Sequence, residues 1–366
     1  MNARIDQFAP TVAVGDGVTN SLLFIRSLLR ELGYASDIYS FSRPPELQGE
    51  VHDAQQLDAT RTDLLLYHHS MGHEHGDWLL ALPCPCALVY HNITPAAFFP
   101  AGSVLHHYAQ QGRLQLQAWR SRFVAALAVS ALNATELSAA GYTAVAQLPL
   151  LVDLARLGGV QQRPAFLAAQ PPQAEYYLAI GRLAENKRQH LLIEAFYHLC
   201  QQHGAEFARR ARLLLVGGTT SEAYAHGLHQ HTAQLGLLGR VLLPGKCNDA
   251  ELRWLYAHAR QYWCASAHEG FCMPLIEAAQ AGLPMLALAT SNIPDTLGEG
   301  GLLLEGEDPL HLALASALLE QQPDLRARVL AGAQRNLQRY GRAVLAEQLG
   351  RWCQEQLGCQ PGMLDG

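Results

Sequence analysis

Long apolar runs are missing from this sequence of 366 residues, and none approaches the ~20 residues that a membrane-spanning helix needs. The stretch Met1 to Pro10 also lacks the apolar centre of a secretory signal peptide. We therefore expect the chain in the cytoplasm.

An excess of basic residues is missing as well. The formal net charge is −6 and only 16% of the residues are charged, which argues against a nucleic-acid-binding protein that works through a broad basic surface. The eight cysteines include no C-x-x-C pair, and several lie in apolar runs where cysteine behaves as a small buried hydrophobe. The sequence therefore predicts free thiols.

Apolar residues make up 49% of the chain, which is typical of a globular protein. A length of 366 residues indicates two domains, each large enough for its own core.

The most informative stretch is 268–282, which reads H-E-G-F-C-M-P-L-I-E-A-A-Q-A-G. It lies between two short apolar runs, 261–267 and 283–289, which are typical of buried parallel strands. Pro274 suits the first turn of a helix and Gly282 its end. The pattern predicts strand, loop, helix and strand.

Two carboxylates belong to this stretch. Glu269 lies in the loop at the carboxyl end of a strand and Glu277 lies on the helix that follows. Open α/β sheets bind ligands at this edge, and a helix N-terminus there favours a phosphate. Carboxylates accept hydrogen bonds from hydroxyls, so a nucleotide sugar fits the combination. The alternative is an ordinary turn with two surface glutamates.

A basic loop follows the predicted strand 176–180 and precedes a predicted amphipathic helix over 189–200. Arg182 and Lys187 place two cations at the carboxyl end of that strand, and both suit a diphosphate. The alternative is a basic turn that caps a surface helix. The intervening stretch 161–173 is rich in Pro, Gln and Ala and predicts a linker or surface excursion.

The first half opens with a predicted strand over 11–15, a loop that contains Gly17 and a helix over 21–32. A glycine after a first strand lets the backbone approach a phosphate closely. Further along, 114–123 is predicted as a helix and 124–130 as a strand.

Histidines gather after the predicted strand 63–67, where His68-His69-Ser70-Met71-Gly72-His73-Glu74-His75 reads as a loop. His69 and His73 have the H-x3-H spacing of metal ligands, but Gly72 disfavours the helix that this would need. Three interpretations stay open: a metal site, a histidine-rich surface loop, and a loop that lines the acceptor side of a cleft, which we prefer. On a strand, adjacent histidines would face opposite sides.

His91 ends the predicted strand 87–90, at the ligand edge of the sheet. Two interpretations stay open. His91 is either a functional imidazole or a histidine whose hydrogen bonds are satisfied at a capped strand end.

The stretch H-E-G-F-x-x-P-L-I-E-A resembles the E-x7-E signature of retaining GT-B glycosyltransferases, in particular glycosyltransferase family 4. G-R-L-x-x-x-K-x-x-x-x-L-I-E-A-F, which starts at Gly181, resembles a second signature of that family. The G-D-G loop resembles the family's N-terminal G-G loop, with Asp16 as a departure. The resemblance spans nearly the whole chain and is strongest over 176–304.

The resemblance implies an α/β fold of the GT-B type, with two Rossmann-like domains whose parallel sheets face a central cleft. Residues 1–151 would form the acceptor-side domain and 152–342 the nucleotide-sugar domain. A final helix within 343–366 would pack back onto the first domain.

By the same resemblance, the catalytic residues would be His91, Glu269, Arg182 and Lys187, and His68 and His69 would lie on the acceptor side. The residues that would bind the donor are Gly17, Arg182, Lys187, Glu269, Gly270, Phe271, Cys272, Met273, Leu275 and Glu277. No metal or other cofactor would be needed, because the cations do a metal's work.

The implied activity is the transfer of a hexose of the mannose, glucose or GlcNAc type from a nucleoside diphosphate sugar, with retention. The acceptor would be a saccharide or a lipid-linked sugar at the inner face of the plasma membrane, contacted peripherally, in bacterial surface polysaccharide or lipopolysaccharide synthesis. The alternatives are another GT-B enzyme, such as an epimerase or a phosphorylase, and a non-catalytic partner subunit that binds nucleotide sugar.

Overall fold

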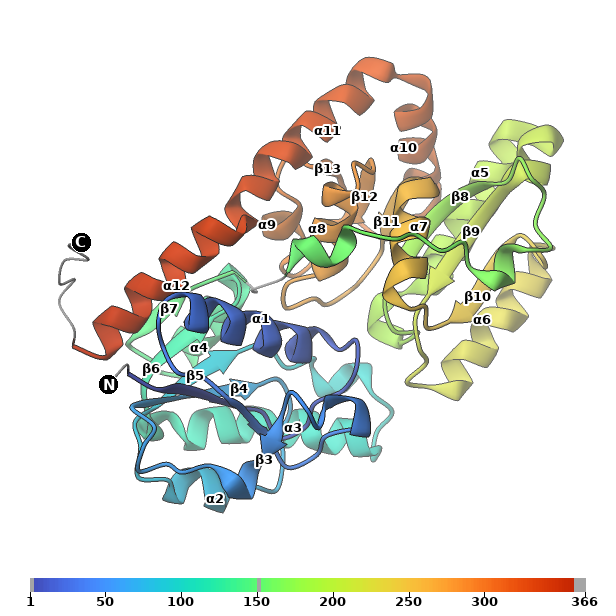
Figure 1. The fold of residues 1–366 in the computed structure, drawn as a ribbon. Coiled ribbons are helices and arrows are strands. Elements are labelled where there is room, and N and C mark those ends of the chain that lie inside the picture. The colour runs from blue at the N-terminus through green and yellow to red at the C-terminus, as the bar shows by residue number, and fades with distance from the viewer. Residues whose placement is uncertain (1–2, 150–152, 359–366) are drawn as a thin grey trace, which may run out of the picture. The chain divides into compact units, whose positions relative to one another are not determined.

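The computed structural model describes residues 3–149 and 153–358, and the chain divides into two compact units (Figure 1). The first unit comprises Met1–Asp153 and Tyr340–Gly366, and the second comprises Leu154–Arg339. The predicted domain boundary between residues 151 and 152 lies outside the described residues, as does Cys359.

The first unit contains a parallel sheet with the strand order β3-β2-β1-β4-β5-β6-β7. Its strands are β1 (Ile5–Phe8), β2 (Ile38–Ser40), β3 (His52–Asp53), β4 (Leu64–His69), β5 (Cys86–Tyr90), β6 (Phe123–Ala128) and β7 (Val145–Gln147). Its helices are α1 (Gly17–Glu31), α2 (Gly76–Ala81), α3 (Val104–Ala118), α4 (Ala131–Ala139) and α12 (Arg342–Gln356).

Helices cover both faces of this sheet, so its strands read as apolar runs. Successive side chains of a strand point to opposite faces. Leu65 and Tyr67 of β4 therefore belong to the core that α2 and α3 cover, whereas Leu66 shares a small apolar cavity with Ile25 of α1 and Leu349 of α12.

The first strand differs from the prediction. The strand predicted over 11–15 is wrong, since only Thr11 forms an isolated bridge there, and β1 lies upstream. Asp6 and Gln7 interrupt the apolar pattern of β1, although both are fully buried. Asp6 is stabilised by an ion pair with Arg4 at 2.8 Å and by the Thr62 hydroxyl at 2.7 Å, so a satisfied buried charge concealed the strand.

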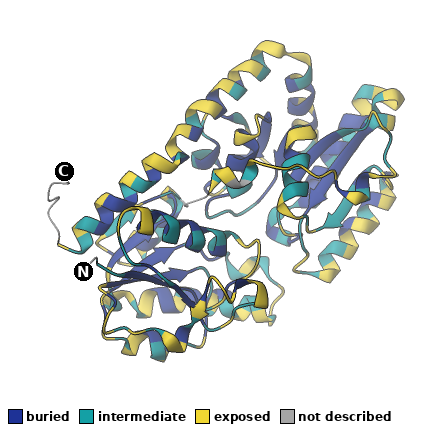
Figure 2. Ribbon diagram, in the orientation of Figure 1, coloured by how far each residue is buried: buried dark blue, intermediate teal, exposed yellow. Residues whose placement is uncertain are grey.

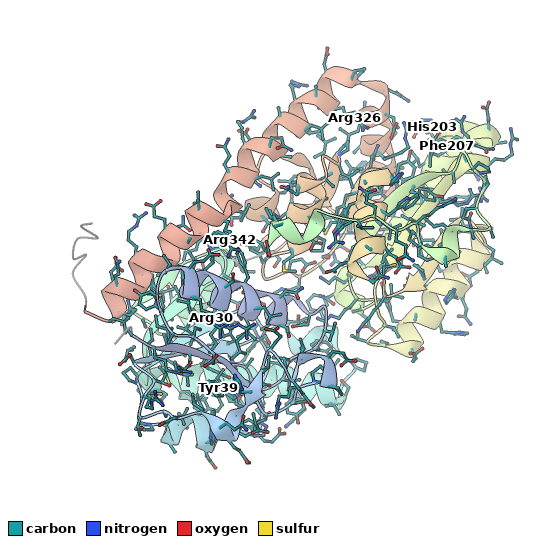
Figure 3. All side chains as sticks on the ribbon, in the orientation of Figure 1. Arg30, Tyr39, His203, Phe207, Arg326 and Arg342 are labelled. Atoms are coloured by element: carbon teal, nitrogen blue, oxygen red, sulfur yellow. The ribbon has the colours of Figure 1, made fainter. Side chains whose placement is uncertain are left out.

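The last helix belongs to the first unit and packs on α1 (Figure 1). Figure 3 shows Arg342 at the start of α12 beside α1. Its guanidinium donates to Ser27 Oγ at 2.7 Å and forms an ion pair with Glu31, and it lies 4.9 Å from the centre of the Phe24 ring. Residues more than 300 positions apart in the sequence thus complete one unit.

The second unit contains a second parallel sheet, with the strand order β10-β9-β8-β11-β12-β13. Its strands are β8 (Glu175–Ile180), β9 (Ala211–Val216), β10 (Val241–Gly245), β11 (Ala259–Cys264), β12 (Met285–Leu288) and β13 (Gly301–Leu304). Its helices are α5 (Gln189–Arg210), α6 (Glu222–Gln234), α7 (Asp249–His258), α8 (Met273–Gln280), α9 (Ile293–Leu297), α10 (Pro309–Gln321) and α11 (Pro323–Leu337).

In the order of its own strands, this sheet has the 3-2-1-4-5-6 arrangement of a dinucleotide-binding fold, which reverses direction between β8 and β11. Its inner strands β9, β8, β11 and β12 are largely buried, its edge strands β10 and β13 are partly exposed, and its helices expose their outer faces (Figure 2). Trp263 packs with Tyr177 and Phe196 in the core under α5, and Tyr256 of α7 stacks near Tyr262 on the opposite face. The predicted α/β class with two parallel sheets is confirmed.

Other boundaries also moved. The helix predicted over 114–123 starts ten residues earlier, at Val104, and Phe123 already belongs to β6. The stretch 161–173 is no free linker, because it packs on the second unit: Leu167 is fully buried and Gln162 N–H donates to Ala250 O. The abundance of Pro, Gln and Ala in this stretch does not reveal that it packs on other residues of the unit.

Candidate functional site

The loops after β8 and β11 flank the point where the strand order of the second sheet reverses. The loop after β8 carries Arg182 and Lys187, and the loop after β11 carries Glu269. Open α/β sheets bind ligands in the crevice that forms at the carboxyl ends of such strands. The structure therefore brings these predicted residues to one edge of one sheet.

Close backbone packing fixes this edge. A β-carbon on Gly217, just after β9, would lie 2.0 Å from the carbonyl oxygen of Gly181, just after β8. Only a glycine allows the two strand ends to approach so closely. The loop that begins at Gly181 thereby starts from a rigid position.

Lys187 and Glu269 form a buried ion pair. Lys187 Nζ donates to Glu269 Oε1 at 2.5 Å, and Ser266 Oγ donates to the same oxygen at 2.8 Å. The side chains are 19% and 11% exposed. Ser266 was not predicted, although a hydroxyl three residues before a loop carboxylate is a signal that could have found it.

The pKa values of the pair show which effect wins. Burial alone would raise the pKa of the Glu269 carboxyl, but the charge of Lys187 and the hydrogen bonds from Lys187 and Ser266 hold it below its usual value. Burial would lower the pKa of Lys187, and the attraction of Glu269 raises it. Both groups are therefore charged at neutral pH.

Backbone contacts hold the Glu269 loop in place. The Glu269 N–H donates to Ser291 Oγ at 3.2 Å, and the same hydroxyl donates to the Glu269 carbonyl at 2.8 Å. On the other side, the Ala267 N–H donates to Asn186 O at 2.7 Å, which joins the two loops. The carboxylate is thus positioned before any ligand arrives.

A cavity of about 20 Å³ lies at the ion pair and is lined by Lys187, Ser266, Glu269, Cys264 and Gly181, among others. Such a volume holds one water-sized group. It joins the charged pair to the thiol of Cys264.

The N-terminus of α8 lies in the same loop. Its N-cap residue, Cys272, makes no side-chain capping hydrogen bond, so the first N–H groups of α8 suit an anion. Glu277 on this helix is buried, and its Oε2 accepts a hydrogen bond from the hydroxyl of Tyr256 at 2.7 Å. Tyr256 comes from α7 and had no signal in the sequence.

The other predicted donor residues lie in this loop or beside it. Phe271, Cys272 and Leu275 have buried side chains, whereas Gly270 and Met273 are partly exposed. Arg182 is exposed, and its guanidinium forms no ion pair with another residue of the described chain.

In the first unit, Gly17 is the first residue of α1 and not part of a loop, and the left-handed turn is made by Gly15, with φ 75°. The carboxylate of Asp16 accepts hydrogen bonds from the N–H groups of Val18 and Thr19. A phosphate at this helix end would have to displace that carboxylate.

His68 and His69 belong to β4 and are 0% and 1% exposed, so the prediction that they lie in a loop is wrong. As expected for a strand, the two rings face opposite sides. His68 Nδ1 lies 2.8 Å from Nε2 of His91, which follows β5. Burial lowers the pKa of His91 to about 3, with a further contribution from His69.

His69 takes part in a network on the other face. Its Nε2 lies 3.0 Å from the Gly112 carbonyl and must carry the proton, so Nδ1 accepts from the hydroxyl of Tyr67 at 2.6 Å. His73 Nδ1 accepts from the N–H of His75, so its Nε2 donates to Tyr67 at 2.8 Å. Two neutral histidines satisfy every bond, and burial lowers the pKa of His69 to about 4 and that of His73 to about 3.

This network leaves no room for the metal that the H-x3-H spacing suggested. Within residues 3–149 and 153–358, the ligand atoms that converge on one point belong to Cys264, Glu269 and Cys272 instead. All seven cysteines in the described part of the chain are free thiols.

Residues 166–336 match the family model described as "Glycosyl transferases group 1". The matched segment lies wholly within the second unit, which is therefore similar to the domain that this model describes. This match ends within α11 and includes both loops of the candidate site.

Two curated relatives are similar to this chain over part of their length. A D-inositol 3-phosphate glycosyltransferase from Streptomyces bingchenggensis is 29% identical over 175 residues, which cover 47% of this chain and 38% of the relative. A GDP-mannose:cellobiosyl-diphosphopolyprenol alpha-mannosyltransferase from Komagataeibacter xylinus is 30% identical over 214 residues, which cover 55% of this chain and 50% of the relative. The chain thus spans half or less of these two relatives.

The similarity in fold extends beyond the segment that the family model matches. A crystal structure of Anabaena HepE in complex with UDP and glucose superposes with a TM-score of 0.74 at 18% identity, and covers 97% of this chain and 100% of its own. The GT-B fold prediction is confirmed. Within the described residues, no helix is both long and apolar enough to cross a membrane.

Proposed function

We propose that the protein is a retaining glycosyltransferase of family 4 that transfers a hexose from a nucleoside diphosphate sugar to a hydroxyl group. The acceptor is a saccharide or a lipid-linked sugar, in bacterial surface polysaccharide synthesis. The UDP and glucose in the HepE complex and the GDP-mannose in a relative's name support a nucleotide-sugar donor.

The buried pair of Lys187 and Glu269 is the observation that supports this function most directly. A cation and a carboxylate are held at the switch point of a nucleotide-binding sheet, beside an uncapped helix N-terminus. Departure of a diphosphate needs positive charge that is in place beforehand, and a sugar needs acceptors for its hydroxyls. The site offers both.

Each group has a proposed role. Lys187, Arg182 and the N–H groups of α8 stabilise the leaving diphosphate, so the transfer needs no divalent metal. Glu269 orients the sugar through the oxygen that Lys187 does not hold, and Glu277 accepts hydrogen bonds from the ribose.

His91 is proposed to donate a hydrogen bond to the sugar. His68 Nε2 is buried without a hydrogen-bond partner in the described chain. Because an unpartnered N–H is costlier than an unpartnered lone pair on the same ring, we assign the His68 proton to Nδ1, which donates to His91 Nε2. Neutral His91 then carries its own proton on Nδ1, where it can serve as a donor.

Thermal stabilisation by a panel of GDP, UDP, ADP, dTDP and their sugars tests the donor site. The nucleotides that carry one particular base should stabilise the protein by about 2.7 kcal/mol when their concentration is 100 times the dissociation constant. The addition of EDTA should not change this stabilisation. A shift that requires a divalent metal, or no shift with any nucleotide, would contradict the proposed site.

Turnover distinguishes transfer from other activities. The preferred sugar nucleotide, incubated with saccharide and lipid-linked acceptors, should yield a glycoside and free nucleoside diphosphate. An epimerised nucleotide sugar without a glycoside would indicate an isomerase, sugar phosphate formed from inorganic phosphate would indicate a phosphorylase, and binding without any product would indicate a non-catalytic subunit.

Glu277→Gln should weaken nucleotide binding about 10- to 100-fold, because a hydrogen bond to a charged acceptor contributes roughly 1.5–3 kcal/mol. Tyr256→Phe should weaken it in the same direction but less, since the carboxylate stays and loses only its support. Titration calorimetry with the preferred nucleoside diphosphate measures both. Tyr197→Phe, a partly buried tyrosine on α5, is the control. Equal affinities in all three variants would remove Glu277 from the site.

A further inference from the structure

Two thiols lie beside the carboxylate of the candidate site. Cys264 is the last residue of β11 and Cys272 is the N-cap of α8, and both side chains are buried. Their sulfur atoms are 3.9 Å apart. One ligand atom from each of Cys264, Cys272 and Glu269 can be chosen so that all three lie within 4.8 Å of one another.

The backbone at Cys272 is unusual. Its φ of 74° and ψ of 65° lie in the left-handed region, which glycine adopts without the strain that a β-carbon introduces. A side chain that persists in a sparsely populated conformation beside a binding site points to a use for that side chain. The group that a glycine would lack here is the thiol.

The distance between the sulfur atoms fits a metal site. With zinc–sulfur bonds of about 2.3 Å and tetrahedral angles, two cysteine ligands lie about 3.8 Å apart. The carboxylate of Glu269 supplies a third ligand, and the cavity of about 20 Å³, which Cys264 and Glu269 line, has room for one water-sized group. Three protein ligands and one open position make a complete zinc coordination sphere.

We propose that Cys264, Cys272 and Glu269 bind a thiophilic divalent cation such as Zn²⁺. The two thiols lose their protons to solvent and form two metal–sulfur bonds, and one carboxylate oxygen forms the third bond. Two thiolates, one carboxylate and a divalent cation carry a net charge of −1, which Lys187 beside Glu269 neutralises. The site thus stays electrically balanced with or without the ion.

The consequence rests on the proposed function. Glu269 is proposed to orient the donor sugar, so an ion that takes this carboxylate competes with the donor. Transfer needs no metal, and thiophilic cations are therefore reversible inhibitors that act from within the donor site.

Titration with Co²⁺ tests the site directly, with a phosphine reductant present to keep both thiols reduced. Tetrahedral Co²⁺ absorbs in the visible range, and cobalt–thiolate bonds absorb in the near ultraviolet. We expect one such Co²⁺ per chain, displaced by Zn²⁺. Cys264→Ala and Cys272→Gly should each weaken binding roughly 100-fold or more, because each removes one of three protein ligands.

Cys272→Gly is the safer variant, because glycine suits the left-handed backbone and the chain should fold. Cys200→Ser, which removes a buried thiol elsewhere in the second unit, is the matched control and should bind Co²⁺ like the wild type. Cys84 and Cys86 are a second pair of neighbouring thiols, and Cys86→Ala shows how much Co²⁺ binds to that pair. An absent tetrahedral signal, or one that survives in Cys272→Gly, overturns the proposal.

The cobalt spectrum requires no turnover, so it can fail or succeed independently of the transferase activity. The preferred nucleoside diphosphate sugar should lower the apparent affinity for Zn²⁺ at least tenfold when it is present at ten or more times its dissociation constant. Unchanged Zn²⁺ affinity would overturn the claim that ion and donor share Glu269, while a persistent cobalt signal would still support the metal site.

Discussion

Lys187→Met is expected to lower kcat/KM by about 100- to 1000-fold and to destabilise the second unit by roughly 3 kcal/mol. The first effect follows from the loss of a fixed charge at the leaving diphosphate. The second arises because Glu269 is left buried without its cation, and breaking a buried ion pair on one side is costly. Steady-state kinetics and urea unfolding measure the two effects on the same samples.

The double variant Lys187→Met, Glu269→Gln separates them. Two neutral side chains of similar shape should recover most of the stability, because no charge remains buried, while activity stays low. Arg335 and Glu299 form an exposed pair at 2.6 Å on the same unit, and the equivalent substitutions there should change neither quantity measurably. Activity restored in the double variant would contradict the assigned role of Lys187.

Acid is expected to unfold the first unit selectively between pH 6.5 and about 4. Burial lowers the pKa of His68 well below 6.5, that of His69 to about 4 and that of His73 to about 3. Below pH 6.5 the unfolded chain therefore binds more protons than the folded one, and stability falls as the pH falls. At pH 5, His69 and His73 each cost about 2 kcal/mol relative to neutral pH, and His68 adds to this cost in the same direction. The sum is a large fraction of a typical domain's stability.

Hydrogen exchange followed by mass spectrometry resolves the two units. At pH 5, corrected for intrinsic rates, peptides from β4 and β5 should lose protection while those from β8 and β11 keep it. His73→Gln should be less stable at pH 7 but lose less on acidification, whereas His229→Gln, at an exposed position on α6, should behave like the wild type. Equal loss of protection in both units would show that other groups control acid unfolding.

The second unit could be predicted well from the sequence because its signals are local. Each strand there is a short apolar run, and Glu269, Arg182 and Lys187 follow strand ends within a few residues. The sequence does not reveal that Lys187 pairs with Glu269, because 82 residues separate them and the sheet order brings them together. Tyr256 was missed for the same reason, since nothing near it in the chain marks its contact with Glu277.

The first unit was predicted less well because polar residues are buried in its strands. Asp6 interrupts the apolar pattern of β1, and His68 and His69 make the end of β4 look like a polar loop. Each of these side chains is hydrogen-bonded to a group far away in the sequence. A pattern of apolar residues cannot distinguish a polar residue in solvent from one that a distant group neutralises. Gly17 was misplaced in the opposite sense. The sequence predicted a loop there, but Gly17 is the first residue of α1, which Asp16 caps.

The position of α12 also sets an order of folding. The second unit is inserted between β7 and α12 of the first, so the ribosome completes Leu154–Arg339 before the helix that covers α1 exists. Since domains fold during synthesis, the second unit can reach its final state while the apolar face of α1 around Ile25 is still uncovered. The unit that begins the chain is therefore the last to be completed, because its final helix is the last element to be translated.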